Sequence, residues 1–146
     1  MTLIELLFVI AILGLVLALA APEFSTIIQK QRLQSDAQRM SWVLRMARQE
    51  AISSGQSQVI YFYTSDTKYK VKNGSTYQLS PGITYLGLTT FAKHDDKAAC
   101  IFLPSGVPSH AGTVTLENQK GELRYIIVSV AAGRIRVSDK PPLNWE

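Results

Sequence analysis

A single carboxylate, Glu5, lies within the apolar run that extends from Met1 to Ala21. Thr2 is the only other polar side chain in that run. An unpaired carboxylate in a lipid environment is costly, so acids inside such segments usually have a partner and a function. We therefore expect Glu5 to form an ion pair with a cationic group.

Arg134 and Arg136 are two residues apart, a spacing that suggests an anion-binding site. In a strand, residues two positions apart project from the same face about 7 Å apart, which is close to the spacing of successive phosphates in a nucleic acid. Arg124, Lys120 and Lys140 would widen this basic patch. The alternative is that the arginines pair with carboxylates such as Asp139, Glu117 or Glu122, or cover a neighbouring subunit. We prefer this alternative because the net charge is only +4.

The sequence contains no recognisable catalytic or metal-binding constellation. His94 and His110 are the only histidines, and Asp95 and Asp96 follow His94 in a polar stretch. One histidine beside two carboxylates lacks a second cluster at ligand spacing, so we interpret this stretch as a solvated loop. Neither a nucleophile with its base nor a glycine-rich phosphate loop is present. We predict a protein that is not an enzyme and has no metal or other cofactor.

The single cysteine and the distribution of basic residues limit the possible chemistry of the chain further. Cys100 is the only cysteine, so the chain cannot form an intramolecular disulfide. Its apolar surroundings, residues 98–103, predict a buried strand position rather than a reactive thiol. All Lys and Arg residues lie at position 30 or later, so the part of the chain beyond the apolar run is mildly basic.

Two helical patterns follow one another from the first residue. Residues 1–23 would span roughly 30 Å as a helix, enough to cross the hydrocarbon of a bilayer. After Lys30 the pattern is amphipathic, and its apolar residues recur at spacings of four and three on one face. These residues are Leu33, Ala37, Met40, Leu44, Ala47 and Ala51. The helix should end at about Ser54, with Gly55 as a left-handed cap.

Gly14 and Pro22 interrupt this long helix. Proline removes one backbone hydrogen bond and clashes with the carbonyl four residues earlier. We therefore expect a kink at Pro22, or melting of the helix between Gly14 and Pro22. The apolar residues from Leu3 to Ala21 would form the membrane-spanning or filament-core part.

Beyond Gly55 the hydrophobic period becomes two, which is typical of strands. Strands are predicted at residues 58–63, 69–72, 76–79, 83–86, 100–103, 113–116, 125–130 and 134–137. We expect their tyrosines to be core or cross-strand residues rather than a platform for stacked bases. A long helix followed by short antiparallel strands predicts an α+β fold, in which the helical stripe packs on the sheet. Residues 24–146 would form a single head that includes the amphipathic helix.

The beginning of the chain, Thr2-Leu3-Ile4-Glu5-Leu6-Leu7, resembles processed type IV pilins and type II secretion pseudopilins. In that family a leader is cut just before residue 1, and Met1 stands where Phe is usual. The absence of Lys and Arg before Lys30 suggests that the numbering begins at this mature terminus. The resemblance implies that Glu5 pairs with the terminal amine of a neighbouring subunit during filament assembly. It also implies a pilin-like fold.

The C-terminal half resembles GspH/FimT-type minor subunits. The matching segments are Phe102-Leu103-Pro104-Ser105-Gly106, Gly112-Thr113-Val114-Thr115-Leu116, Ile126-Ile127-Val128-Ser129 and Gly133-Arg134-Ile135-Arg136-Val137. FimT-type subunits with a Gly-Arg-x-Arg segment are associated with DNA capture for natural transformation. The resemblance therefore implies DNA as a partner of Arg134 and Arg136.

We interpret the chain as a structural subunit of a type IV pilus-like filament or a type II secretion pseudopilus. The alternatives are a DNA-binding minor pilin and a membrane-anchored monomeric binding protein. Whether the chain is a minor subunit or the main one stays open. The resemblance implies as partners further copies in a helical filament, other pilin-like subunits, the prepilin peptidase and the assembly platform. It places the chain in the bacterial inner membrane before assembly and in a periplasmic or cell-surface filament afterwards.

Overall fold

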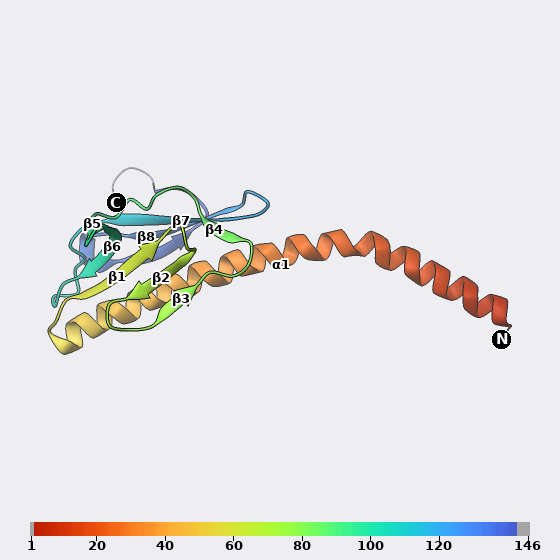
Figure 1. Cartoon of the computed structure of the whole chain (residues 1–146), viewed down its shortest axis with the longest axis horizontal. Helices are drawn as coiled ribbons and strands as arrows, with labels where there is room; N and C mark the ends of the chain where they lie inside the picture. Colours follow the sequence, from red (N-terminus) through yellow and green to blue (C-terminus); the bar gives the residue numbers. More distant parts are fainter. Residues whose placement is uncertain (1, 143–146) are drawn as a thin grey trace.

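The computed structural model describes the backbone of residues 2–142, with the side chains of all of these except residues 17–24 and 132. One long helix, α1 (Leu3–Ser54), precedes the strands. Its N-terminal half extends away from the head, and its C-terminal half lies against the strands (Figure 1). This arrangement confirms the predicted α+β fold.

Both ends of α1 have identifiable caps. At the start, Thr2 and Glu5 form a capping box, in which each side chain accepts a hydrogen bond from the backbone of the other. At the end, Gly55 has a φ of 67°, the left-handed conformation predicted for the cap. The six apolar residues predicted to share one face are all buried, with at most 5% of any side chain exposed. The amphipathic part of the helix was therefore predicted correctly.

The strands form two antiparallel sheets. The strands are β1 (Gln58–Tyr63), β2 (Lys68–Val71), β3 (Thr76–Gln78), β4 (Ile83–Tyr85), β5 (Lys93–His94), β6 (Lys97–Phe102), β7 (Gly112–Asn118), β8 (Leu123–Val128) and β9 (Ile135–Ser138). A short 3₁₀ helix, η1 (Ala131–Gly133), joins β8 to β9. The five-stranded sheet has the order β3-β2-β1-β6-β5, and the four-stranded sheet has the order β4-β7-β8-β9.

Helix α1 packs on both sheets, and the core lies between them and the helix. It contacts β1 of the five-stranded sheet and β7, β8 and β9 of the four-stranded sheet. Large buried side chains come from the helix and from both sheets, among them Leu44, Phe102 and Ile126. The sequence predicted a single sheet under the helix, whereas the structure has two.

The segment between β4 and β5 connects the two sheets. The N–H of Thr90 donates to the carbonyl of Thr113 in β7, and the N–H of Ala99 in β6 donates to the carbonyl of Ala92. Between these two bonds, the buried ring of Phe91 stacks on Phe62 with 5.2 Å between ring centroids. The segment thus joins one sheet to the other.

The turn that follows β5 agrees with its prediction at Asp95 and Asp96, which are exposed, and differs at His94. His94-Asp95-Asp96 was expected to be a solvated loop, but His94 belongs to β5 and pairs with Lys97 of β6. Asp95 and Asp96 both have positive φ angles, which place them in a tight hairpin turn. The hydroxyl of Tyr61 donates to Oδ2 of Asp95 at 2.7 Å. This contact spans 34 residues of sequence, so the local pattern could not indicate it.

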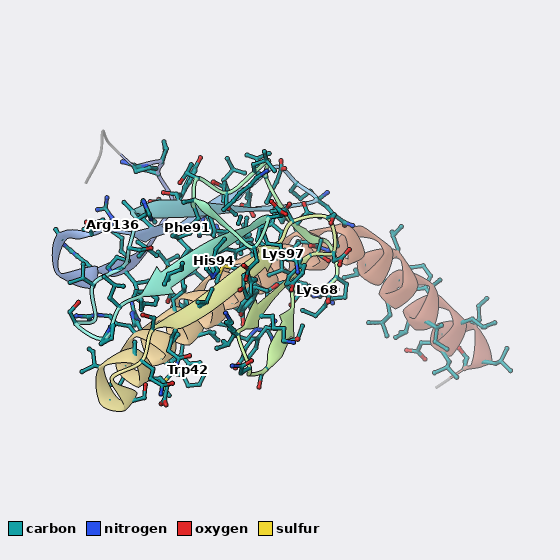
Figure 2. The ribbon with its side chains drawn as sticks, turned by 60° about the vertical axis from the view of Figure 1, so that its left-hand side comes forward. Trp42, Lys68, Phe91, His94, Lys97 and Arg136 are labelled. Carbon is teal, nitrogen blue, oxygen red and sulfur yellow. The ribbon has the colours of Figure 1, made fainter. Side chains whose placement is uncertain are left out.

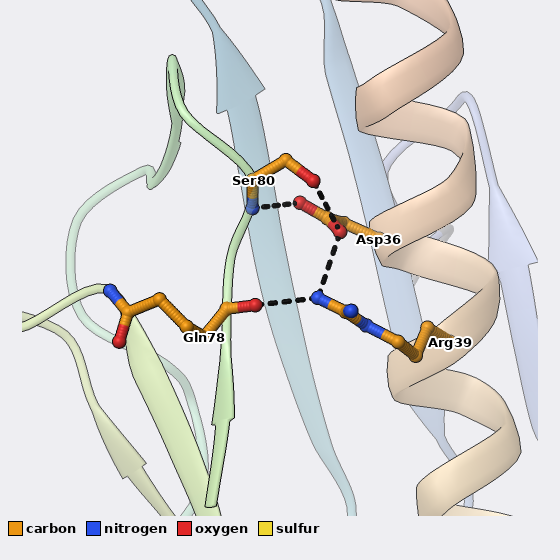
Figure 3. A network of polar contacts seen from close by, with 4 residues as sticks. All are labelled: Asp36, Arg39, Gln78 and Ser80. Carbon is orange, nitrogen blue, oxygen red and sulfur yellow. Dashed lines mark hydrogen bonds and ion pairs between the residues drawn. The ribbon is translucent and has the colours of Figure 1, made fainter.

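A polar network fixes α1 to the loop before β4 (Figure 3). The carboxylate of Asp36, only 2% exposed, accepts hydrogen bonds from the backbone N–H of Ser80 at 2.6 Å and from its hydroxyl at 3.0 Å. Arg39 lies 3.2 Å from the same carboxylate and also donates to the carbonyl of Gln78. The network holds the helix at a fixed position on the head.

Candidate functional site

Glu5 lies in the first turn of α1. Its Oε2 accepts a hydrogen bond from the N–H of Thr2 at 3.3 Å, and its own N–H donates to Oγ1 of Thr2 at 3.4 Å. The free N–H groups of a helix N-terminus also favour a negative charge there. Met1, whose amine the family resemblance pairs with Glu5 of a neighbour, lies outside the described residues.

Residues 3–16 of α1 expose a largely apolar surface. The exposed fraction is 78% for Leu3, 68% for Phe8 and 56% for Val16. Monomeric soluble proteins rarely expose apolar surface of this extent, and such surfaces mark sites of association. Within the residues that the structure describes, no helical stretch is long and apolar enough to cross a membrane.

Gly14 and Pro22 lie in the continuous helix α1. A Cβ atom added to Gly14 would meet no other atom within 4 Å, so the single subunit imposes no close contact on this glycine. The side chain of Pro22 lies outside the described residues. The helix that was predicted to kink or melt between Gly14 and Pro22 is therefore not melted in the single subunit, and loss of helix there in the assembled filament stays a prediction.

Three of the five residues of the predicted basic patch, Arg124, Arg134 and Arg136, line one groove between α1 and β9, which we call the arginine groove. Its volume is about 960 Å³. Its lining residues are Gln34, Gln38, Ser41, Trp42, Arg45, Arg124, Arg134, Ile135, Arg136, Val137, Ser138 and Asp139. Lys140 is exposed and not among them. Figure 2 shows Trp42 projecting from α1 and Arg136 from the C-terminal part of the head.

Two arginines of the groove bridge the helix and the four-stranded sheet. Arg45 on α1 donates to the carbonyl of Ile135 in β9 at 3.1 Å. Arg124 on β8 donates through Nε to Oε1 of Gln34 on α1 at 2.8 Å. These two side chains therefore have structural partners, whereas the alternative interpretation of the basic patch concerned Arg134 and Arg136 and stays a prediction. The carboxylates named as partners in that interpretation take no part in these two bridges.

Sequence reasoning did not identify the helix side of the groove. Trp42, which is 55% exposed, and Arg45 were not predicted as functional residues. The signal was present, because Gln34, Gln38, Trp42 and Arg45 follow one another at spacings of four, four and three and so share a helical face. This face lies beside the buried stripe, and its partner strand is about 90 residues away in sequence.

The glycine of the Gly-Arg-x-Arg segment has a structural role. Gly133 has a φ of 60°, and a Cβ atom there would lie 2.4 Å from the carbonyl oxygen of Gly106. It would also lie 2.8 Å from Nε of Arg48, which donates to the same carbonyl at 2.9 Å. Only glycine fits such a close approach of two backbones. Packing therefore accounts for the glycine of the segment.

The remaining candidate groups are structural. Cys100 is buried, as predicted, and burial raises the pKa of its thiol, which keeps it protonated. Tyr69 stacks on Tyr77 across β2 and β3, and burial raises the pKa of Tyr69 to about 12. Among the described residues, no group of three His, Cys, Asp or Glu side chains is placed to hold a metal ion.

Solved structures share this fold. The minor pseudopilin EpsH from the Type 2 Secretion System of Vibrio cholerae matches with a TM-score of 0.61 and 15% identity, over 73% of this chain and 96% of that one. The type IV minor pilin FimU of Pseudomonas aeruginosa matches in one crystal form with a TM-score of 0.58 and 18% identity, over 77% of this chain and 92% of that one. A second crystal form of FimU gives a TM-score of 0.56, 19% identity and coverage of 73% and 92%.

The sequence itself matches a protein family, described as type II transport protein GspH, over residues 36–133. This match covers more than half of the chain. No curated protein sequence matches this chain. The family is one of transport proteins and not of enzymes, in agreement with the prediction. The chain therefore belongs to the GspH family of type II transport proteins.

Proposed function

We propose that this chain is a structural subunit of a type II secretion pseudopilus or of a type IV pilus-like filament. The observation that carries the proposal is the exposed apolar surface of residues 3–16, in the part of α1 that extends from the head, with Glu5 in its first turn. A rod of this kind buries its surface when several copies pack side by side. The family match and the printed descriptions of EpsH and FimU support the same role.

The apolar start of α1 also suggests the steps by which the subunit would enter the filament. The apolar residues at the start of the chain would hold the subunit in the inner membrane until a prepilin peptidase has processed it and an assembly platform has extracted it. In the filament, Glu5 would neutralise the terminal amine of a neighbour inside the apolar core, where either charge alone is costly. The assembled filament would then lie in the periplasm or at the cell surface.

The test separates the charge of Glu5 from its capping role. Glutamine can replace glutamate in a capping box, so Glu5→Gln keeps the cap and removes the charge. We expect this variant to insert into membranes normally and to be lost from filaments, because the neighbour's amine has no counter-charge. The measurement is the amount of variant in sheared or purified filaments relative to the membrane fraction.

Glu50→Gln is the matched control, because Glu50 is an exposed carboxylate on the same helix but within the head. This control should assemble as the wild type does. Filaments that contain Glu5→Gln at wild-type levels would contradict the ion-pair mechanism. If both variants fail to assemble while the head stays folded, charge on the helix in general is required rather than Glu5 in particular.

A second candidate function, capture of DNA by a minor pilin, is supported by the arginine groove. Arg134 and Arg136 line it together with Arg45 and Arg124, so four arginines border one groove. Trp42 adds an exposed aromatic ring to the same lining. Basic grooves with aromatic side chains bind nucleic acid through phosphate contacts and stacking. Arg134 and Arg136 carry the spacing that the sequence analysis matched to successive phosphates, so they are the residues to test.

If DNA binds there, the full chain in zwitterionic nanodiscs should bind it without sequence preference and more weakly as salt rises. Arg134→Ala with Arg136→Ala should reduce the log-log salt slope by roughly 2 units, because two phosphate contacts are lost. Lys70→Ala with Lys72→Ala is the matched control, since it removes two exposed cations at the same spacing from the other sheet. Equal slopes for the two double variants would exclude the groove as a DNA site.

A further inference from the structure

A second groove lies on the face of the four-stranded sheet that points away from α1. Its volume is about 690 Å³. Thr113 and Thr115 of β7 line it with their cross-strand partners Ile127 and Tyr125 of β8. The side chains that alternate with them, such as Val114, are buried in the core on the other face. We call this site the outer groove.

The outer groove has an apolar and uncharged lining. Leu88 and Val130 belong to it, and they are 85% and 44% exposed. Ile127 is only 3% exposed, although it lies on the outward face of the sheet. None of the described residues that line the groove carries a charge. Apolar surface gathered in one concave place marks a site of association, and the lack of charge favours an apolar side chain as the occupant.

The exposed side of α1 carries apolar side chains suited to such a groove. Trp42 and Met46 are 55% and 50% exposed. They are four residues apart, so they are neighbours on one face of the helix. Trp42 projects from α1 (Figure 2). Tryptophan and methionine are both enriched at the centres of protein interfaces. We call this pair the apolar ridge.

The apolar ridge and the outer groove of one chain lie on different sides of the four-stranded sheet. Helix α1 packs on the inner face of that sheet, where Val114 and Ile126 are buried. The outer groove opens on the opposite face, so a chain cannot place its own ridge in its own groove. Two different patches that meet between copies form a heterologous contact. Such a contact generates rings or open helical filaments rather than closed two-fold dimers.

We propose that the apolar ridge of one copy inserts into the outer groove of the next copy in a filament. This inference rests on the proposed function of the chain as a filament subunit, and it assigns the contact between neighbouring heads. The indole ring of Trp42 would cover the apolar lining, where the hydroxyls of Thr113 and Thr115 can accept its N–H.

The size of this contact explains why it belongs to the filament. A buried tryptophan covers about 150–250 Å², whereas a stable interface buries about 800 Å² on each partner. The ridge alone is therefore too small to hold two heads together. It acts in addition to the packing of the apolar surface of residues 3–16, which brings the copies side by side.

A charge swap across the contact tests the proposal in filaments of the full chain. Met46→Glu and Leu88→Lys each place a charge in an apolar contact, so each alone should lower the amount of subunit in purified filaments by about tenfold or more. Both positions are exposed in the single subunit, so the head should stay folded, and thermal unfolding checks this. When one chain carries both changes, the new carboxylate faces the new ammonium of the next copy. Assembly should then recover to within about threefold of the wild type.

Met46→Glu with Thr84→Lys is the matched control, since Thr84 is an exposed threonine of the same sheet that does not line the groove. This chain should assemble as poorly as Met46→Glu alone. Single variants that assemble like the wild type would overturn the contact and leave the proposed function intact. A swap that recovers no more than the control would do the same. If the wild-type chain itself forms no filaments, the proposed function is wrong and this contact with it.

Discussion

The buried carboxylate of Asp36 illustrates how single residues set the position of the helix. It lies on the apolar face of α1 between Leu33 and Met40, and it satisfies two donors of Ser80 in addition to Arg39. A buried charge with several hydrogen bonds specifies one arrangement, because any other leaves the charge or its donors unpaired. Asp36 thereby fixes both the rotation of α1 and the course of the loop before β4.

Replacing Asp36 should destabilise the head in a graded way. Asp36→Ala removes every acceptor and leaves the N–H of Ser80 without a partner, at a cost of about 3 kcal/mol in the free energy of unfolding. Asp36→Asn keeps one acceptor oxygen and should cost roughly half as much. Denaturant unfolding of the full chain in detergent measures both values. Equal stability of Asp36→Ala and the wild type would contradict the role assigned to the network.

For single residues, the sequence predicted which side chains are buried better than it predicted their polar contacts. The burial of Leu33, Ala51 and Cys100 follows from local patterns, because apolar spacing reports which face of an element is covered. The partner of Asp36 lies 44 residues away, and the partner of Arg45 lies 90 residues away. Such pairs depend on how the elements meet in space, and no local pattern records that.

Among the elements, the strands and the helix were largely predictable, whereas their grouping into sheets was not. Strands β1 to β4 lie within one or two residues of their predicted bounds, and β6 begins three residues earlier than predicted. Strand β5 was missed because Lys93 and His94 have no apolar alternation. The ring of Phe91 lies against Phe62 of one sheet and would meet any Cβ placed on Gly112 of the other, and no local sequence pattern indicates such contacts between distant residues.

The tight connection between η1 and β9 predicts how a substitution of Gly133 affects the stability of the head. Gly133→Ala should destabilise the head by about 2 kcal/mol or more, because alanine strains a positive φ and collides with the carbonyl of Gly106. Gly87→Ala is the matched control, since Gly87 has a similar φ of 66° but open space around it. The difference between the two unfolding free energies isolates the collision. If the two variants are equally stable, the close approach of Gly133 to Gly106 is wrong.

For the whole molecule, the continuity of α1 in the single subunit bears on the shape of the filament. Glycine lowers helix propensity by about 1 kcal/mol relative to alanine, and proline removes a backbone hydrogen bond, so the stretch from Gly14 to Pro22 is the weakest part of the helix. We expect this stretch to lose regular helical structure when neighbouring subunits pack around it. Filament density that shows a straight helix from Thr2 to Ser54 would contradict this expectation.

The order in which the chain is synthesised gives the bridge between α1 and β9 a kinetic consequence. The stripe on α1 that packs against the sheets is made early, but Ile135, which receives the hydrogen bond from Arg45, is made about 90 residues later. Contacts between such distant residues require the closure of long loops, which slows folding. The head therefore cannot complete its fold until most of the chain has emerged. During that interval the N-terminal segment has already been synthesised, while the head that follows it is still unfolded.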